Sequence, residues 1–274
     1  MEKNDTHPSS LFQSAISGDT HALAIRRDRV AQASRSLAAL KAVQRISSDS
    51  VNFHETALQG LPLIIEGVVG DWSINSYKRD DLRHSFGALK VFPRMGDYVM
   101  PLPTEGVTSN EMTLLDYLDL IEQAGPTPPP YIGDHSLPIS SMCDWPPYFE
   151  NWHTPRVWLG PSGTVTRLHC DFEDNLFAQI WGRKRFLLYP HSARPNLYIE
   201  EVHPTLFISS FDPEYPNYDL YPLARSEEAV ECILEPGDLL YLPAGWFHHV
   251  KALDFSLSVN RWTPDEPIII TASN

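Results

Sequence analysis

The second half of the chain is a series of short, strand-like segments separated by turn residues, and this pattern most constrains the fold. The turns are marked by Gly163, Gly182 and the pair Pro236–Gly237. The strand-like segments cover residues 156–160, 164–171, 175–181, 184–189, 238–242 and 255–262. Short strands at such spacing predict a mainly β fold, a double-stranded β-helix or jelly-roll barrel of the cupin kind.

Helical signals are confined to the first half of the chain. Residues 20–45 contain no Pro or Gly, and Leu23, Val30 and Leu37 fall on one side of a helix. We therefore predict residues 1–45 as an N-terminal helical extension and 46–274 as the cupin-type domain. Within that domain residues 61–69 predict a strand, and residues 113–122 predict a short helix with Thr113 near its N-cap.

The composition excludes several classes of protein. The chain has 274 residues and a formal net charge of −14, which repels nucleic-acid phosphates, so we expect no nucleic-acid partner. Its three cysteines lack the spacing of a zinc site or a disulfide framework. Because no apolar run would cross a membrane or act as a signal peptide, we expect a cytoplasmic protein without membrane contact. A homodimer, if formed, is expected to use the helix around residues 20–45.

A long connection from residue 190 to about 225 interrupts the strand pattern. It is rich in Pro, Tyr and acidic residues. Loops of this length inside a compact domain are usually functional, and we expect this one to lie over the opening of the barrel.

His169 and Asp171 are separated by one residue on a predicted strand. Side chains at positions i and i+2 face the same way, so both point into the barrel and Cys170 points out. A third ligand must come from another strand, and His248 follows Asp171 by enough residues to lie on a returning strand. Two imidazoles and one carboxylate form the facial site that holds non-haem Fe(II) with coordination positions left open. His249 is expected to face the opposite side of its strand.

Three stretches of the chain together resemble the Jumonji C family of Fe(II)- and 2-oxoglutarate-dependent oxygenases. The similarity is greatest to the small hydroxylase branch typified by the asparaginyl hydroxylase that inhibits hypoxia-inducible factor. The matching stretches are HCDFEDNLFAQIWGRKR (169–185), GDLLYLPAGWFHH (237–249) and SVNRW (258–262).

The resemblance implies a full set of site residues. It implies His169, Asp171 and His248 as the catalytic metal ligands and Lys184 as the cation for the distal carboxylate of 2-oxoglutarate. Trp262 recurs near the substrate side in related hydroxylases, but a Trp at strand spacing is ordinarily core, and Gln179 equally fits a structural role. Residues implied to contact or surround the co-substrate are Thr166, Asn260, Asn175 and Tyr131.

One departure from the family pattern is the pair Arg167–Leu168, where many relatives carry Pro or Ala. Arg167 reaches toward the entrance if its strand is bulged. This departure bears on the identity of the substrate, because the residues for iron and co-substrate are intact.

The implied activity is a dioxygenase that uses Fe(II), 2-oxoglutarate and O2 to hydroxylate a C–H bond of a peptide or protein side chain, releasing succinate and CO2. Three alternatives stay open. They are hydroxylation of a free amino acid or natural product, N-methyl-lysine demethylation, and a non-catalytic cupin binding module. The intact metal and co-substrate residues favour an enzyme over the last of these.

Overall fold

The fold of the computed structural model consists mainly of two β-sheets whose strands are mostly antiparallel. The structure describes residues 40–50, 60–94, 110–123, 129–146, 153–171, 173–203 and 206–262. The 7-stranded sheet contains, in order, β1 (Gln44–Ser47), β2 (Leu63–Glu66), β13 (Leu239–Leu242), β8 (Asn175–Trp181), β15 (Ser256–Trp262), β6 (Arg156–Gly160) and β5 (Ile132–His135). The 6-stranded sheet contains β10 (Ile199–His203), β11 (Leu206–Ser209), β7 (Val165–Cys170), β14 (Phe247–Ala252), β9 (Lys184–Tyr189) and β12 (Val230–Leu234). This is the predicted jelly-roll barrel of the cupin kind.

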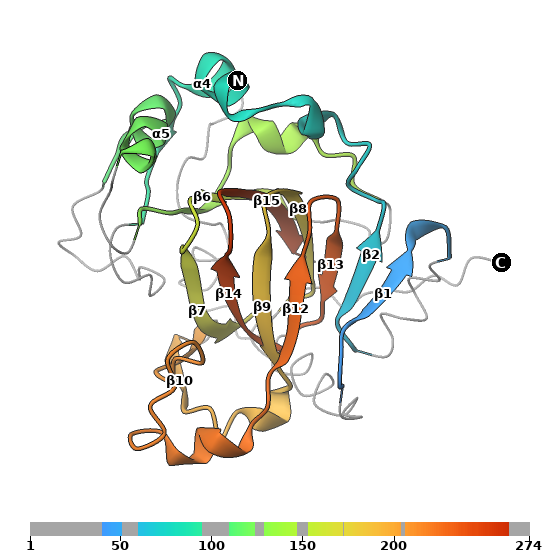
Figure 1. The fold of residues 1–274 in the computed structure, drawn as a ribbon, viewed down its shortest axis with the longest axis vertical. Coiled ribbons are helices and arrows are strands. Elements are labelled where there is room, and N and C mark those ends of the chain that lie inside the picture. Colours follow the sequence, from blue (N-terminus) through green and yellow to red (C-terminus); the bar gives the residue numbers. More distant parts are fainter. Residues whose placement is uncertain are drawn as a thin grey trace.

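The remaining elements flank the sheets. The helices are α4 (Arg79–Phe86) and α5 (Leu114–Glu122), which lie together at the top of Figure 1. A small third sheet pairs β3 (Lys90–Val91) with β4 (Met112–Thr113). Single 3-10 turns are η1 (Ser48–Ser50), η2 (Ser73–Ser76), η3 (Pro138–Met142), η4 (His191–Ala193) and η5 (Pro222–Ser226).

An apolar core fills the space between the two sheets. Trp158 and Phe177 from the 7-stranded sheet meet Phe186, Leu188 and Val250 from the 6-stranded sheet. The rings of Phe177 and Phe186 pack edge to face with centroids 5.3 Å apart. Alternation along each strand therefore gives both sheets an inner face, and the residues of the candidate site lie on it.

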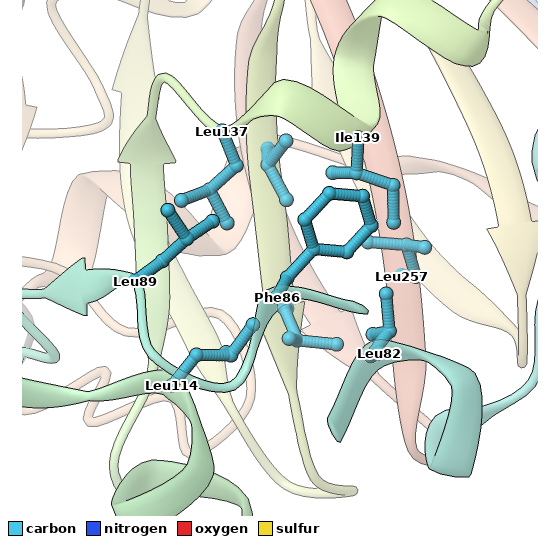
Figure 2. Close-up of a pocket in the computed structure, with 9 residues that line it drawn as sticks. Leu82, Phe86, Leu89, Leu114, Leu137, Ile139 and Leu257 are labelled. Carbon is cyan, nitrogen blue, oxygen red and sulfur yellow. The ribbon is translucent and has the colours of Figure 1, made fainter. Parts of the chain in front are cut away.

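A second core lies on the outer face of the 7-stranded sheet, where α4 and α5 cover it. Leu82 and Phe86 of α4 and Leu114 of α5 surround a small apolar gap together with Leu137, Ile139 and Leu257 (Figure 2). The side chains that line this gap are all apolar, so it offers no group to orient a polar ligand or to act in catalysis.

The helix predicted over residues 113–122 is confirmed. Thr113 accepts a hydrogen bond at Oγ1 from the backbone N–H of Asp116 (3.0 Å), and Asp116 reaches back to the N–H of Thr113, so the helix begins with a capping box. Tyr117 donates its hydroxyl hydrogen to the carbonyl of Leu159 at 2.9 Å, which ties α5 to β6. No helix in the described ranges is long and apolar enough to span a membrane.

The helix predicted over residues 20–45 falls mostly outside the described residues. At its end the prediction was wrong, because residues 40–43 are not helical and Gln44 begins strand β1. β1 pairs in parallel with β2, and Arg45 binds the Asp238 carboxylate at 2.9 Å. Pairing with the sheet therefore outweighs the local helical preference at these residues.

The connection from residue 190 to 225 is not a lid in its described part. β10 and β11 form a hairpin that extends the 6-stranded sheet, and Phe207 and Phe211 pack with Phe247 on the outer face of that sheet. Lys251 donates to Glu214 at 2.7 Å and holds the following turn on the same face. Packing on the sheet buries the apolar side chains of Phe207 and Phe211, which stabilises this position of the segment.

Candidate metal and co-substrate site

His169, Asp171 and His248 meet on the inner face of the 6-stranded sheet. His169 of β7 lies directly opposite His248 of β14, and Asp171 follows the last residue of β7. Nε2 of His169 lies 3.9 Å from Oδ1 of Asp171, and Nε2 of His248 lies 3.8 Å from Oδ2. One ligand atom from each residue lies within 4.8 Å of the others, so one metal ion would contact all three.

The two imidazoles are already oriented for a metal. Nδ1 of His169 contacts the carbonyl oxygen of Arg167 at 2.7 Å, and Nδ1 of His248 contacts that of Trp246 at 3.0 Å. A carbonyl can only accept, so each Nδ1 carries the hydrogen and each Nε2 presents a lone pair. Burial, followed by the neighbouring His169, lowers the pKa of His248 and keeps it in the neutral form that binds metals.

A β-bulge in β7 brings Thr166 onto the same side as His169. His248 pairs with His169 and Val250 pairs with Thr166, so two steps on β14 oppose three on β7. Strict alternation would have turned Thr166 away from the site. The extra residue falls at Arg167–Leu168, the pair that departs from the family pattern. Leu168 packs with Phe207, Phe211 and Phe247 on the outer face of the 6-stranded sheet, in what we call the outer cluster.

A chain of hydrogen bonds fixes the Asp171 carboxylate. Trp262 donates from Nε1 to Oδ2 at 2.9 Å, and Asn175 donates from Nδ2 to the same oxygen at 3.2 Å. Asn260 in turn donates to Oδ1 of Asn175 at 3.0 Å and accepts from Nε1 of Trp158 at 2.6 Å. Because both donors use Oδ2, Oδ1 is the oxygen left for a metal.

Asn175 and Asn260 thus have partners that the resemblance did not imply. Both were predicted to contact or surround the co-substrate, and the structure places their amides in the chain that ends on Asp171. The strand spacing of Trp262 is ordinarily that of a core residue. In the structure its indole N–H donates a hydrogen bond to Asp171, a predicted metal ligand.

Lys184 is a buried cation on the inner face of β9, 1% exposed. Its Nζ donates to the Tyr131 hydroxyl at 3.2 Å and lies 5.2 Å from the centre of the Phe177 ring. Among the described residues no carboxylate pairs with it, and burial lowers its pKa to about 7. A desolvated ammonium without an anion is costly, so this position suits an anionic ligand.

Lys184 and the three predicted ligands are separated along neighbouring strands of the 6-stranded sheet. Lys184 pairs with Ala252, four residues beyond His248 on β14. At the rise of a strand this separation is about 13 Å along the backbone. Thr166 and Tyr131 are buried on the same inner side.

Two further residues have plain structural placements. Gln179 donates to the carbonyls of Trp181 and Gly182 and accepts from Ser258, so it holds the turn before Lys184. His249 is 2% exposed and pairs with Leu187, whose side chain lies in the outer cluster. It therefore lies on the opposite side of β14 from His248, as the alternation of the strand requires.

The profile of the cupin-like domain family matches residues 49–267. The chain belongs to this family. The cupin-like match spans the two described sheets almost completely and includes every residue discussed in this subsection.

Several curated proteins are similar to this cupin-like chain. Lysine-specific demethylase 8 of Xenopus tropicalis is 29% identical over 215 residues, which is 73% of this chain and 47% of the relative. The human bifunctional peptidase and (3S)-lysyl hydroxylase JMJD7 is 33% identical over 127 residues, 39% of this chain and 40% of the relative. The tRNA wybutosine-synthesizing protein 5 of Danio rerio is 35% identical over 143 residues, 47% of this chain and 43% of the relative.

The comparisons confirm the resemblance to Jumonji C proteins at the level of the family. Other similar proteins carry the Jumonji C name itself, including one from Drosophila melanogaster at 35% identity. The finer likeness to the asparaginyl hydroxylase stays a prediction. The chain spans less than half of the length of each of the three relatives described above.

Sequence reasoning missed four residues near this site: Trp158, Arg94, Asp134 and Arg156. Trp158 lies in a predicted strand, and its bond to Asn260 gave no signal in the sequence. The other three come together only through the pairing of β5 with β6 and of Arg94 with Tyr131.

Proposed function

We propose that this chain is an Fe(II)- and 2-oxoglutarate-dependent oxygenase that hydroxylates a C–H bond of a peptide or protein side chain. The observation that carries the proposal is a His–Asp–His cluster on the same inner face as the buried ammonium of Lys184, which has no carboxylate partner among the described residues. A metal site alone fits many cupins, whereas the added cation supports a carboxylate-bearing co-substrate.

Different residues of the chain would bind the metal and the co-substrate. His169, Asp171 and His248 would hold Fe(II), and Lys184 with Tyr131 would hold the distal carboxylate of 2-oxoglutarate. With both groups bound, the iron supplies the oxidation of R–H by O2 to R–OH, coupled to conversion of 2-oxoglutarate to succinate and CO2. The apolar inner core, including Phe186 and Val250, would limit the access of water to this space.

Demethylation of N-methyl-lysine is a second candidate, because relatives of this chain are named as lysine-specific demethylases. It would need the same iron and co-substrate residues, and the product would differ. Hydroxylation adds one oxygen to the substrate, whereas demethylation removes one methyl group as formaldehyde. A nucleic-acid substrate is disfavoured by the net charge of −14, although one relative is named for a role in tRNA modification.

The test is succinate formation by the purified chain with Fe(II), ascorbate and 2-oxoglutarate, without substrate and with pools of lysine-containing and methyl-lysine-containing peptides. We expect slow succinate formation alone and faster formation with a productive pool. Mass spectrometry of the peptides then separates a gain of oxygen from a loss of methyl. A metal-loaded chain that forms no succinate under any of these conditions would contradict the proposal.

A further inference from the structure

Arg94 lies at the edge of the 7-stranded sheet with its guanidinium beside the inner face. Its backbone pairs with that of Tyr131 through N–H to carbonyl bonds of 2.8 and 3.0 Å. Nη2 donates to the carbonyl of Gly133 at 3.4 Å, and Cζ lies 5.6 Å from the centre of the Trp158 ring. The backbone pairing and these contacts together define where the guanidinium lies.

Gly133 makes this arrangement possible because it has no side chain. A Cβ at Gly133 would lie 3.0 Å from Cζ3 of Trp158 and 3.3 Å from Cζ of Arg94. The contact of the cation with the indole ring therefore depends on the glycine of the Tyr131–Ile132–Gly133 segment.

Trp158 joins Arg94 to the candidate metal site. Its ring contacts the Arg94 guanidinium, and its Nε1 donates to Asn260, the start of the hydrogen-bond chain that ends on Asp171. The Trp158 ring also lies 6.0 Å from that of Tyr131, the partner of Lys184. Arg94 is therefore connected to Asp171 through Trp158, Asn260 and Asn175, and its backbone is paired directly with that of Tyr131.

One nitrogen of Arg94 has no partner. The residue as a whole is partly exposed, but Nη1 is shielded from solvent and makes no hydrogen bond within the described residues. Burial lowers the pKa of Arg94, opposed mainly by the nearby Asp134. A shielded guanidinium nitrogen without an acceptor is costly unless a ligand supplies one.

Among the residues that the structure describes, the charges around Arg94 leave a net positive charge. Nε of Arg156, which is buried, lies 3.4 Å from Oδ1 of Asp134. Asp134 has a backbone φ of 60°, and the register of β5 against β6 shifts at this position. Its carboxylate lies close to Arg156 in this conformation. Two guanidiniums thus share one carboxylate, in a chain whose net charge is −14.

We propose that Arg94 is a substrate-binding residue that takes a carboxylate of the substrate, beside the Trp158 ring. This inference rests on the proposed function for the identity of the ligand as substrate. One surplus positive charge matches a carboxylate, and a guanidinium binds a carboxylate through charge-assisted, paired hydrogen bonds. The carboxylate belongs either to an acidic side chain beside the target residue or to the carboxyl terminus of a small substrate.

The experiment is affinity selection with mass spectrometry on the full chain loaded with Mn(II) and saturating 2-oxoglutarate without oxygen. The probes are four tripeptide libraries, all capped at the amino terminus. They combine a Glu or a Gln side chain with either a free or an amidated carboxyl terminus. We expect about tenfold enrichment of a carboxylate-bearing library over its amide counterpart. Enrichment that follows Glu indicates an acidic side chain, and enrichment that follows the free terminus indicates a small substrate.

Variants decide whether Arg94 is responsible. Arg94→Gln should abolish the enrichment and Arg94→Lys should retain part of it, with 2-oxoglutarate affinity unchanged in both. Arg183→Gln is the matched control, because it removes the same charge from an exposed turn where Arg183 pairs with Asp254. The inference would be overturned if the acid and amide libraries were retained equally or if neither were retained. It would also be overturned if the enrichment survived in Arg94→Gln. The readout is binding, so it can succeed or fail independently of succinate formation.

Discussion

Trp262 donates its indole N–H to Oδ2 of Asp171 at 2.9 Å, and this bond joins the last described residue of β15 to the one anionic ligand of the candidate metal site. Asn175 donates to the same oxygen. The carboxylate is therefore held by two donors before any metal arrives, which lowers the cost of ordering it on binding.

Replacing Trp262 by Phe should weaken metal binding by about tenfold or more, because it removes a hydrogen bond to a ligand and keeps most of the packing. The measurement is the dissociation constant for Mn(II) or Fe(II) by titration. Trp246→Phe is the matched control, since the Trp246 indole donates to the carbonyl of Gly60 at 3.0 Å and not to a ligand. Equal losses in the two variants would show that the Trp262 bond does not orient Asp171.

Replacing Asp171 by Ala should abolish succinate formation and weaken metal binding more than Trp262→Phe does, because the only anionic ligand is lost. The same titration and succinate assay measure both effects. His249→Ala is the control, because His249 lies on the opposite side of β14. Turnover that persists in Asp171→Ala would remove Asp171 from the site.

Sequence patterns were sufficient for the barrel fold and for six of its strands, and the three residues predicted as metal ligands lie together in the structure. Alternation at i and i+2 places His169 and Asp171 on one side without knowledge of any partner strand. The family resemblance added Lys184, whose burial agrees with an inward position.

The remaining features of the fold and the site depend on pairing between segments that are distant in the sequence. The bulge that brings Thr166 beside His169 is defined only by the register of β7 against β14. The hairpin of β10 and β11 forms because β7 offers an edge and an apolar outer face, neither of which is visible in residues 190–225. The contact of Arg94 with Trp158 likewise arises from segments more than 60 residues apart.

Replacing Lys184 by Met should raise the dissociation constant for 2-oxoglutarate by at least about tenfold and leave metal binding nearly unchanged. It removes the cation and keeps the length of the side chain. Isothermal titration on the Mn(II)-loaded chain measures both constants. A 2-oxoglutarate affinity equal to that of the original chain would show that Lys184 does not bind the co-substrate.

The same lysine predicts a pH dependence. Burial lowers its pKa in the free protein to about 7, from 10.5 in an exposed lysine, whereas a bound dicarboxylate favours the charged form and raises the pKa. Binding above about pH 7 must therefore take up a proton, and the affinity for 2-oxoglutarate should fall as the pH rises from that value. Calorimetry in buffers of different ionisation enthalpy measures this uptake, which should be absent in Lys184→Met.

Lys184 also predicts how the stability of the ligand-free protein changes with pH. Its folded pKa lies below its unfolded pKa, so the folded state is penalised fully below about pH 7 and the penalty is relieved as the pH rises toward 10.5. Lys184→Met should therefore be more stable than the original chain near neutral pH, and the difference should shrink in alkaline buffer. Urea unfolding at several pH values measures this, and a difference that is constant or grows with pH would contradict it.

The turn that leads into Lys184 predicts a steric limit at Gly182. Gly182 has a φ of +64°, and a Cβ there would lie 2.3 Å from the carbonyl oxygen of Phe255, whereas Gly163 has a φ of +86° with open space around its Cβ position. Gly163→Ala should therefore cost about 1 kcal/mol of unfolding free energy from the backbone conformation alone. Gly182→Ala should cost about 2 kcal/mol or more, because the collision adds to the same conformational penalty. Urea unfolding of the two variants separates the conformational penalty from the steric one. Equal losses of unfolding free energy would show that the turn relaxes around the new methyl group. Because Lys184 follows Gly182 by two residues, Gly182→Ala should also weaken 2-oxoglutarate binding, while Gly163→Ala should not.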